Sequence, residues 1–301
     1  MRRVATLIAK GFCMGAADIV PGVSGGTIAF ILGIYRDLIE AIRSFDLRWI
    51  MGCLKLDLGV AFTRPHFAFL IPLLAGIFTA VMFFTRVVEL PRLIHSHPEE
   101  VYGLFFGLVV ASVVILMTQL GRLRGADAAT MTLGFIAGFV VVTAVPTNTP
   151  HEWWFILCCG AVAICAMVVP GISGSFVLLI LGQYAYILDA LGHFEWRVIF
   201  PFMIGAALGL MSFTRLLSWI LRHFERHTLF GINGILIASL WVIWPFQERH
   251  YVVVRGKQRL LESNPQLPAL NEELFGPVGL ALLGFFAVIA LERLAGRVRG
   301  A

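Results

Sequence analysis

Six apolar segments of membrane-spanning length follow one another along this chain of 301 residues and constrain its fold more than any other feature. They cover the ranges 66–90, 101–119, 128–146, 198–220, 229–246 and 276–293. The hydrocarbon core of a bilayer is crossed by a helix of roughly 20 apolar residues. Because that core holds no water for exposed backbone groups, segments of this length are predicted to be helices. The sequence therefore predicts an all-α integral membrane protein.

The low content of charged residues excludes an ordinary soluble domain. Only 14% of the residues are charged, against about 25% in soluble domains, and the mean hydropathy is +0.87. The net charge of +5 is expected to report membrane orientation, not a nucleic-acid partner. Four of the five cysteines lie in apolar segments, and the eight histidines have no metal-ligand spacing, so no disulfide framework, metal or cofactor is expected.

The chain also contains an internal repeat that includes the pattern Pro-Gly-x-Ser-Gly. Segments 20–42 and 169–191 align at a constant offset of 149, which pairs Pro21 with Pro170, Gly22 with Gly171, Ser24 with Ser173, Gly25 with Gly174, Gly33 with Gly182 and Tyr35 with Tyr184. Three later blocks follow in the same order, ending in Phe84-Thr85-Arg86 with Phe213-Thr214-Arg215, Gly107 with Gly234, and Leu133-Gly134-Phe135 with Leu283-Gly284-Phe285. Four ordered blocks indicate duplication, with a first repeat at 1–146 and a second at 147–301.

Each repeat is predicted to hold a re-entrant helical hairpin followed by three transmembrane helices. The hairpins cover about 4–42 and 152–192, and a Pro-Gly pair interrupts each of them. Proline removes a backbone donor and glycine weakens the helix, which frees polar backbone groups at membrane depth. Such groups are tolerated only inside protein or beside a polar cavity, and matching interruptions in two halves mark a transporter's binding site. The alternative is an ordinary kinked helix.

The segments outside these elements complete the predicted architecture. Residues 43–62 mix basic and apolar side chains, which predicts a helix lying in the membrane interface. Residues 247–275 form the longest polar stretch and are predicted to be a loop. With three spans in each repeat the second repeat is inverted, and 15 Lys and Arg residues then fall on the amino-terminal face against 6 on the other. The positive-inside rule predicts an inner-membrane, multi-pass protein with both termini in the cytoplasm.

Two arginines inside spans are the first candidates for substrate binding. Arg86 and Arg215 each follow a threonine at equivalent places in the repeat. An arginine inside a span costs at least about 2.5–3.5 kcal/mol on insertion scales, so it normally has a partner or a purpose. A guanidinium group binds phosphate through two parallel hydrogen bonds. The alternative is that both side chains extend to the lipid headgroups.

The interruptions supply the other candidates for a phosphate site: Ser24, Gly25, Gly26, Ser173, Gly174 and Ser175. Backbone amides at a helix start that faces the middle of the membrane would bind an anion. Asp18 has no acidic counterpart in the second repeat, and it could bind a proton or pair with Arg86; Glu89 could also pair with Arg86. Small residues alone could instead serve packing, as in Gly22-x-x-x-Gly26 and Gly103-x-x-x-Gly107, within one chain or in a homo-oligomer.

The run from Lys10 to Thr27, with Pro-Gly-Val-Ser-Gly-Gly-Thr at its end, resembles a bacterial and archaeal membrane family described as polyprenyl-phosphate (undecaprenyl-phosphate) transporters. The similarity extends over essentially the whole chain, although Ser175 replaces the second glycine in the second copy. The resemblance implies a flippase that returns the polyprenyl phosphate from the outer to the cytoplasmic leaflet, so that the carrier lipid is recycled in cell-envelope synthesis. It also implies that the phosphate-binding roles fall on the serines, glycines and arginines named above.

Two other functions compete with this interpretation. One is a transporter of another small anion. The other is an undecaprenyl-diphosphate phosphatase, since such enzymes also have repeated hairpins with Pro-Gly-x-Ser, but they need an arginine beside the serine and a glutamate cluster. Here Gly25 and Gly174 follow the serines, and no span contains Glu-x-x-x-Glu. We therefore expect a transporter and not an enzyme.

Overall fold

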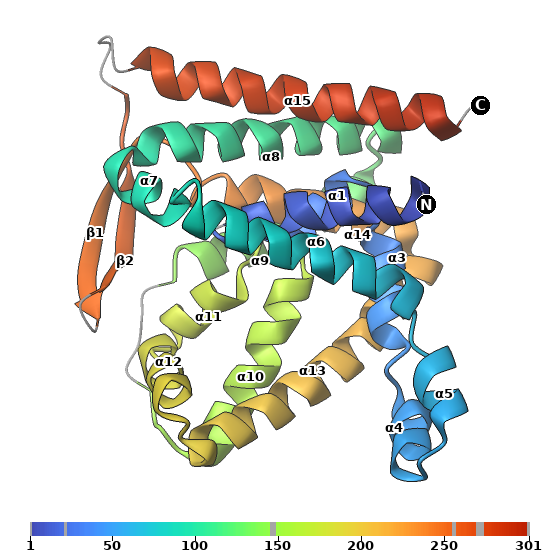
Figure 1. Ribbon diagram of the computed structural model, residues 1–301. Helices are drawn as coiled ribbons and strands as arrows, with labels where there is room; N and C mark the ends of the chain where they lie inside the picture. The colour runs from blue at the N-terminus through green and yellow to red at the C-terminus, as the bar shows by residue number, and fades with distance from the viewer. Residues whose placement is uncertain (1, 21–22, 145–148, 255–256, 269–273, 300–301) are drawn as a thin grey trace.

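The computed structural model describes residues 2–20, 23–144, 149–254, 257–268 and 274–299. Within these ranges the chain is helical apart from one β-hairpin (Figure 1). The elements in order are α1 (Arg2–Asp18), α2 (Gly25–Ile31), α3 (Tyr35–Arg43), α4 (Leu47–Leu54), α5 (Leu58–Thr63), α6 (Phe67–Arg86), α7 (Leu90–Ser96), α8 (Pro98–Leu120), α9 (Gly125–Val142), α10 (Trp153–Val168), α11 (Gly174–Ile180), α12 (Tyr184–His193), α13 (Trp196–His223), α14 (Glu225–Ser239), β1 (Gln247–Val254), β2 (Lys257–Pro265) and α15 (Phe275–Arg299).

Four of the described helices are long and apolar enough to cross a membrane: α6, α8, α9 and α13. A fifth crossing is possible if α11 and α12, which meet at a bend of 110°, count as one broken span. The multi-pass character that the sequence predicts is thus confirmed. The predicted span at 229–246 is too long, because α14 ends at Ser239 after 15 residues, a length of about 22 Å. Pro245 follows shortly, and proline and its preceding residue both disfavour a continuing helix.

The β-hairpin corrects the prediction of a loop at 247–275. β1 and β2 pair in antiparallel fashion from Gln247–Pro265 to Val254–Lys257, with an irregularity between His250 and Tyr251. The run Tyr251-Val-Val-Val is rich in residues that favour strands. The two-stranded hairpin also departs from the predicted all-α fold.

The long helices pack in two kinds of pair, and each kind occurs twice. α1 packs on α6 as α10 packs on α13, and α8 packs on α15 as α14 packs on α9. In the first kind, a Cβ on Gly76 would collide with the carbonyl oxygen of Ile8, and a Cβ on Gly205 with that of Leu157. Small residues allow such close backbone approach between helices.

The second kind of pair shows the same correspondence. A Cβ on Gly107 of α8 would collide with the carbonyl oxygen of Ala281 in α15, and a Cβ on Gly234 of α14 with that of Met131 in α9. The glycines are partners in the aligned blocks of the sequence, and so are the helices that they contact. The close contacts therefore recur at the positions that a duplication would relate.

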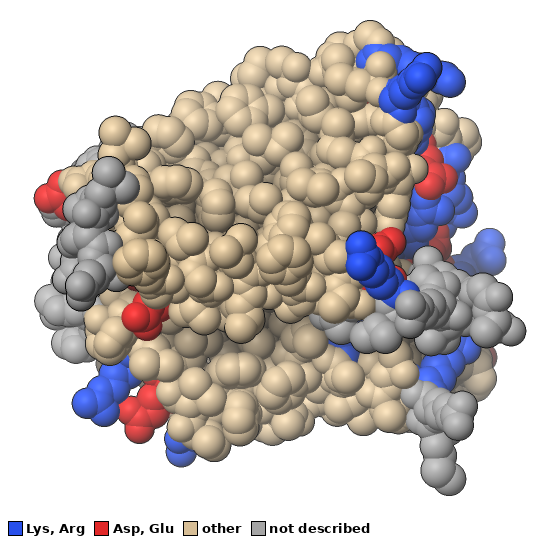
Figure 2. All heavy atoms as spheres, turned by 90° about the horizontal axis from the view of Figure 1, so that it is seen from above, with Lys and Arg blue, Asp and Glu red and all other residues tan. Residues whose placement is uncertain are grey.

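Charged side chains gather at one end of the molecule. Figure 2 shows most of the visible Lys and Arg at this end and a wide band without charge beside it. The first and last helices, α1 and α15, have their outer ends there as well (Figure 1). We call it the basic end; the ion pairs Arg36–Glu225 and Arg226–Asp127 join α3 to α14 and α14 to α9 within it.

Two short helices, α4 and α5, replace the single interfacial helix expected at 43–62. The chain turns between them because Leu56 adopts a left-handed φ of 55° and Asp57 caps α5 by accepting a bond from the Val60 amide at 3.1 Å. Several large apolar side chains of this unit are exposed: Met51, Leu54, Leu56, Leu58 and Phe62. A position in the membrane interface stays a prediction for it.

An ion pair at the base of the α4–α5 unit gives a pH-dependent prediction. Asp46 caps α4 and binds the guanidinium of Arg64 at 2.9 and 2.5 Å, which lowers the pKa of Asp46 to about 2. A lowered folded-state pKa contributes stability above the ordinary aspartate value of about 3.9 and loses it as pH falls toward 2. We expect Asp46→Asn, which keeps a capping side chain, to lower amide protection over residues 47–63 at pH 6. In the wild-type protein this protection should fall between pH 4 and 2, and in the variant that fall should be absent. Hydrogen exchange checks this, and Asp57→Asn, which has no arginine partner, is the control.

Candidate functional site

Each half of the chain has a helix break at the predicted place. α1 ends at Asp18 and α2 begins at Gly25, and α10 ends at Val168 and α11 begins at Gly174. We call residues 18–26 the first tip and residues 167–175 the second tip. Pro21 and Gly22 lie outside the described residues.

A second pair of breaks was not predicted. Gly33 and Gly182 adopt left-handed φ values of 67° and 65°, and new helices, α3 and α12, begin at Tyr35 and Tyr184. The second arm of each predicted hairpin is thus two helices. The two glycines were already paired in the repeat, so the sequence held this signal, since a left-handed backbone favours glycine.

The second tip contacts the two helices that follow the first tip, α2 and α3, through buried hydrogen bonds. The amide of Gly171 donates to Oγ1 of Thr27 at 2.9 Å, and the hydroxyl of Tyr35 donates to the carbonyl oxygen of Val168 at 3.0 Å. Thr27 and Tyr35 were not among the predicted site residues. These contacts join the two halves of the chain between the second tip and the helices directly after the first tip.

The first tip already holds a carboxylate. Oδ1 of Asp18 accepts a hydrogen bond from the amide of Gly25 at 2.6 Å, and Oγ of Ser24 accepts one from the amide of Gly26 at 3.2 Å. The absence of a side chain at Gly25 lets Asp18 approach, because a Cβ there would lie 2.5 Å from Oδ2 of Asp18. The amides that the sequence assigns to an external anion are therefore engaged by the chain itself.

The second tip differs because its own side chains leave the amides uncapped. The counterpart of Asp18 is Met167, whose Cβ lies 3.3 Å from the position of a Cβ on Gly174. Oγ of Ser173 bonds to Oγ of Ser175 at 2.9 Å, and Ser173 makes no side-chain cap on α11. Met167 and Ser175 are exposed. Ser173 thus has the same extended backbone as Ser24 at the start of its helix, but the position that corresponds to Asp18 holds no carboxylate.

The two arginines have different surroundings. Arg86 is the last residue of α6 and is exposed, whereas Arg215 lies inside α13 and is half-buried. Neither has an ion pair or hydrogen bond with any residue that the structure describes. The expected partners are bound elsewhere: Glu89 pairs with Arg92 at 3.3 Å, and Asp18 with the Gly25 amide. Within the described residues, neither Asp18 nor Glu89 is paired with Arg86.

A polar contact between the halves lies at the basic end. Oε1 of Glu40 in α3 accepts a hydrogen bond from Ser218 in α13 at 2.7 Å, and Arg222 donates to the same serine at 2.9 Å. The related helices in the other half would be α12 and α6. In the described part of the chain α12 packs on α13 and makes no comparable contact with α6. The two halves therefore differ in how this helix packs.

Comparison with known proteins decides the family. Residues 14–259 match the model of the family described as undecaprenyl phosphate translocase-like. The chain belongs to this family. It is 37% identical over 265 residues to the polyprenyl-phosphate transporter of Vibrio cholerae, covering 88% of this chain and 83% of that protein. It is 28% identical over 259 residues to the polyprenyl-phosphate transporter of Staphylococcus aureus, covering 79% and 85%.

Membership of the undecaprenyl phosphate translocase-like family confirms the resemblance found in the sequence. Both relatives are named as transporters and neither as an enzyme, in agreement with the expectation of a transporter. No solved structure matches the chain.

Proposed function

We propose that this protein transports polyprenyl phosphate and returns it from the outer to the cytoplasmic leaflet of the inner membrane. The observation that carries the proposal is the pair of tips, of which one binds a carboxylate and the other offers the same amides uncapped. A phosphate headgroup is an anion that such amides bind. The names of the family and of both relatives favour a polyprenyl phosphate as the compound that carries this headgroup.

The substrate phosphate binds first at the second tip, to Ser173 and the amides of Gly174 and Ser175. The first tip, with Ser24, Gly25 and Gly26, accepts it only when Asp18 releases the Gly25 amide. Asp18 would then couple the movement of the substrate to its own release or protonation. Arg86 and Arg215, which lie in the later parts of α6 and α13, meet the phosphate on either side of the tips.

An inverted repeat would let access alternate between the two faces of the membrane. The recurring glycine contacts support this division of the chain at about residue 146. In this proposal the contact of Glu40 with Ser218 holds the two halves together at the basic end in one of the two states. The opposite state would break this contact and bring α12 onto α6. By the positive-inside rule the basic end, where α1 and α15 have their outer ends, faces the cytoplasm.

Leaflet exchange in liposomes tests the proposed function. We expect the reconstituted protein to accelerate leaflet exchange of a fluorescent polyprenyl phosphate. The corresponding diphosphate should exchange no faster than it does in liposomes without protein. The reason is that amide and guanidinium groups set for one phosphate leave part of a larger, more highly charged headgroup unpaired. Transport of inorganic phosphate without exchange of the lipid would favour the small-anion transporter. Release of phosphate from the diphosphate lipid would favour the phosphatase. Either result would reject the proposal.

A further inference from the structure

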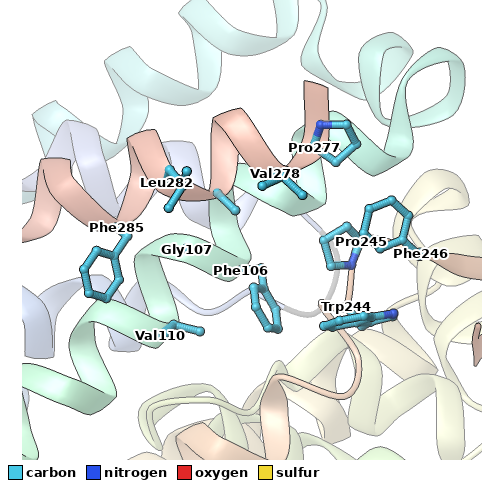
Figure 3. A pocket seen from close by; sticks show the side chains of 11 residues that line it. Phe106, Gly107, Val110, Trp244, Pro245, Phe246, Pro277, Val278, Leu282 and Phe285 are labelled. Carbon is cyan, nitrogen blue, oxygen red and sulfur yellow. The ribbon is translucent and has the colours of Figure 1, made fainter. Parts of the chain in front are cut away.

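An apolar cavity of about 280 Å³ lies between α8, α15 and the segment that follows α14 (Figure 3). Its walls include Phe106 and Val110 of α8, Trp244 and Pro245, and Val278 and Phe285 of α15. These side chains surround an open space in the close-up view, and no charged residue lines it. We call it the α8–α15 groove.

The walls of the groove are held in place by contacts outside it. The Trp244 ring packs edge-on against Phe106, with centroids 5.3 Å apart. Its one polar atom, Nε1, donates to the carbonyl oxygen of Gln266 at 3.0 Å, so the ring offers the groove only apolar surface. Gly107 lets α8 and α15 meet backbone to backbone beside the cavity. A preformed apolar cavity of this kind binds an apolar ligand at little cost in ordering the protein.

The related helix crossing is lined differently. There, at the α9–α14 pair, Asp127 takes the place of Pro277, is buried, and binds Arg226 at 2.8 Å. Asn233 takes the place of Phe106. The crossing at the basic end thus holds an ion pair, whereas the crossing where α15 begins, beside the β-hairpin (Figure 1), holds the apolar groove.

We propose that the α8–α15 groove binds the polyprenyl chain of the substrate while its phosphate is at the tips. This rests on the proposed function, since it supplies the site for the second half of the same molecule. The groove lies at the end opposite the basic end, where a lipid taken from the outer leaflet would enter. It distinguishes a long polyprenyl phosphate from other phosphate compounds, because each apolar group that enters a fitted pocket adds to binding.

A filled groove provides the test. Val110→Trp in the full chain, reconstituted in liposomes, is expected to lower exchange of a long-chain polyprenyl phosphate about tenfold and to leave exchange of geranyl phosphate, tagged with the same fluorophore, unchanged. Val140→Trp is the matched control: Val140 lies on α9, is 62% exposed and does not line the groove. Equal loss with both lipids, or no loss with either, would overturn the proposal.

A second measurement separates the polyprenyl chain from ordinary membrane lipid. A polyprenyl phosphate with a diazirine at the end of its chain is expected to label residues 106–110 or 278–285, and excess phospholipid should not compete. Equal competition by phospholipid would mean that the groove holds any acyl chain. Exchange of neither tagged lipid by the wild-type protein would reject the proposed function itself, whereas normal wild-type exchange with an insensitive Val110→Trp variant would reject the groove alone.

Discussion

Replacing Arg86 and Arg215 together by alanine is expected to reduce leaflet exchange of polyprenyl phosphate about a hundredfold or more. Hydrogen bonds to charged groups contribute about 1.5–3 kcal/mol each, and a guanidinium can make two to one phosphate. Because neither arginine side chain has a partner among the described residues, the substitution removes no hydrogen bond or ion pair seen there. The folded state should therefore survive, and exchange in liposomes together with thermal unfolding in detergent measures the two effects separately.

The control for this variant is Arg92→Ala, since Arg92 is 82% exposed and, among the described residues, forms an ion pair with Glu89 alone. Lysine at both sites keeps the charge but loses the planar pair of donors, so Arg86→Lys with Arg215→Lys should recover part of the activity. The single variants Arg86→Ala and Arg215→Ala show for each arginine whether it binds the substrate or extends to the lipid headgroups. If Arg86→Ala exchanges lipid normally while Arg215→Ala does not, Arg86 is an interfacial residue. Normal exchange by the folded double variant would remove both from the site.

Much of the helical architecture could be predicted because its causes are local. Apolar length marks helices such as α6 and α13, and the Pro-Gly pairs mark both tips. The breaks at Gly33 and Gly182 were missed because an isolated glycine is often tolerated inside a helix, and only its paired occurrence distinguishes these two. The end of α14 was missed because apolar character continues beyond Ser239 while helical structure does not.

The site itself could be predicted only in part, since its contacts depend on how distant segments pack. The sequence placed Ser24 and Ser173 at the tips, but not the bond from Gly171 to Thr27 across 144 positions. The alignment of the repeats shows that Asp18 has no acidic counterpart. The hydrogen bond from the Gly25 amide to Asp18, however, depends on the turn between the two residues. The pairing of Glu89 with Arg92 depends on how the chain turns after α6. Such contacts follow from tertiary geometry, which residue spacing alone does not determine.

Met167→Asp is expected to slow leaflet exchange strongly, because it would give the second tip the carboxylate that the first tip already has. Met167 faces Gly174 as Asp18 faces Gly25. The new carboxylate would therefore accept a hydrogen bond from the Gly174 amide and occupy the place of the substrate phosphate. A tethered group has an effective concentration in the millimolar range or above, so it outcompetes a dilute lipid. Leaflet exchange should fall at least about tenfold, since a hydrogen bond to a charged group is worth 1.5–3 kcal/mol.

Met167→Asn is the matched control, because asparagine has nearly the same shape as aspartate without its charge. Met167 is 49% exposed, so neither polar side chain has to be buried in the core, and both variants should fold. If the asparagine variant exchanges lipid and the aspartate variant does not, the negative charge at the second tip is what blocks the substrate, and the phosphate binds there. If both exchange lipid normally, the second tip is not the phosphate site. Equal loss in both variants would show that Met167 is needed for its apolar side chain, and the asymmetry between the tips would then concern packing instead of anion binding.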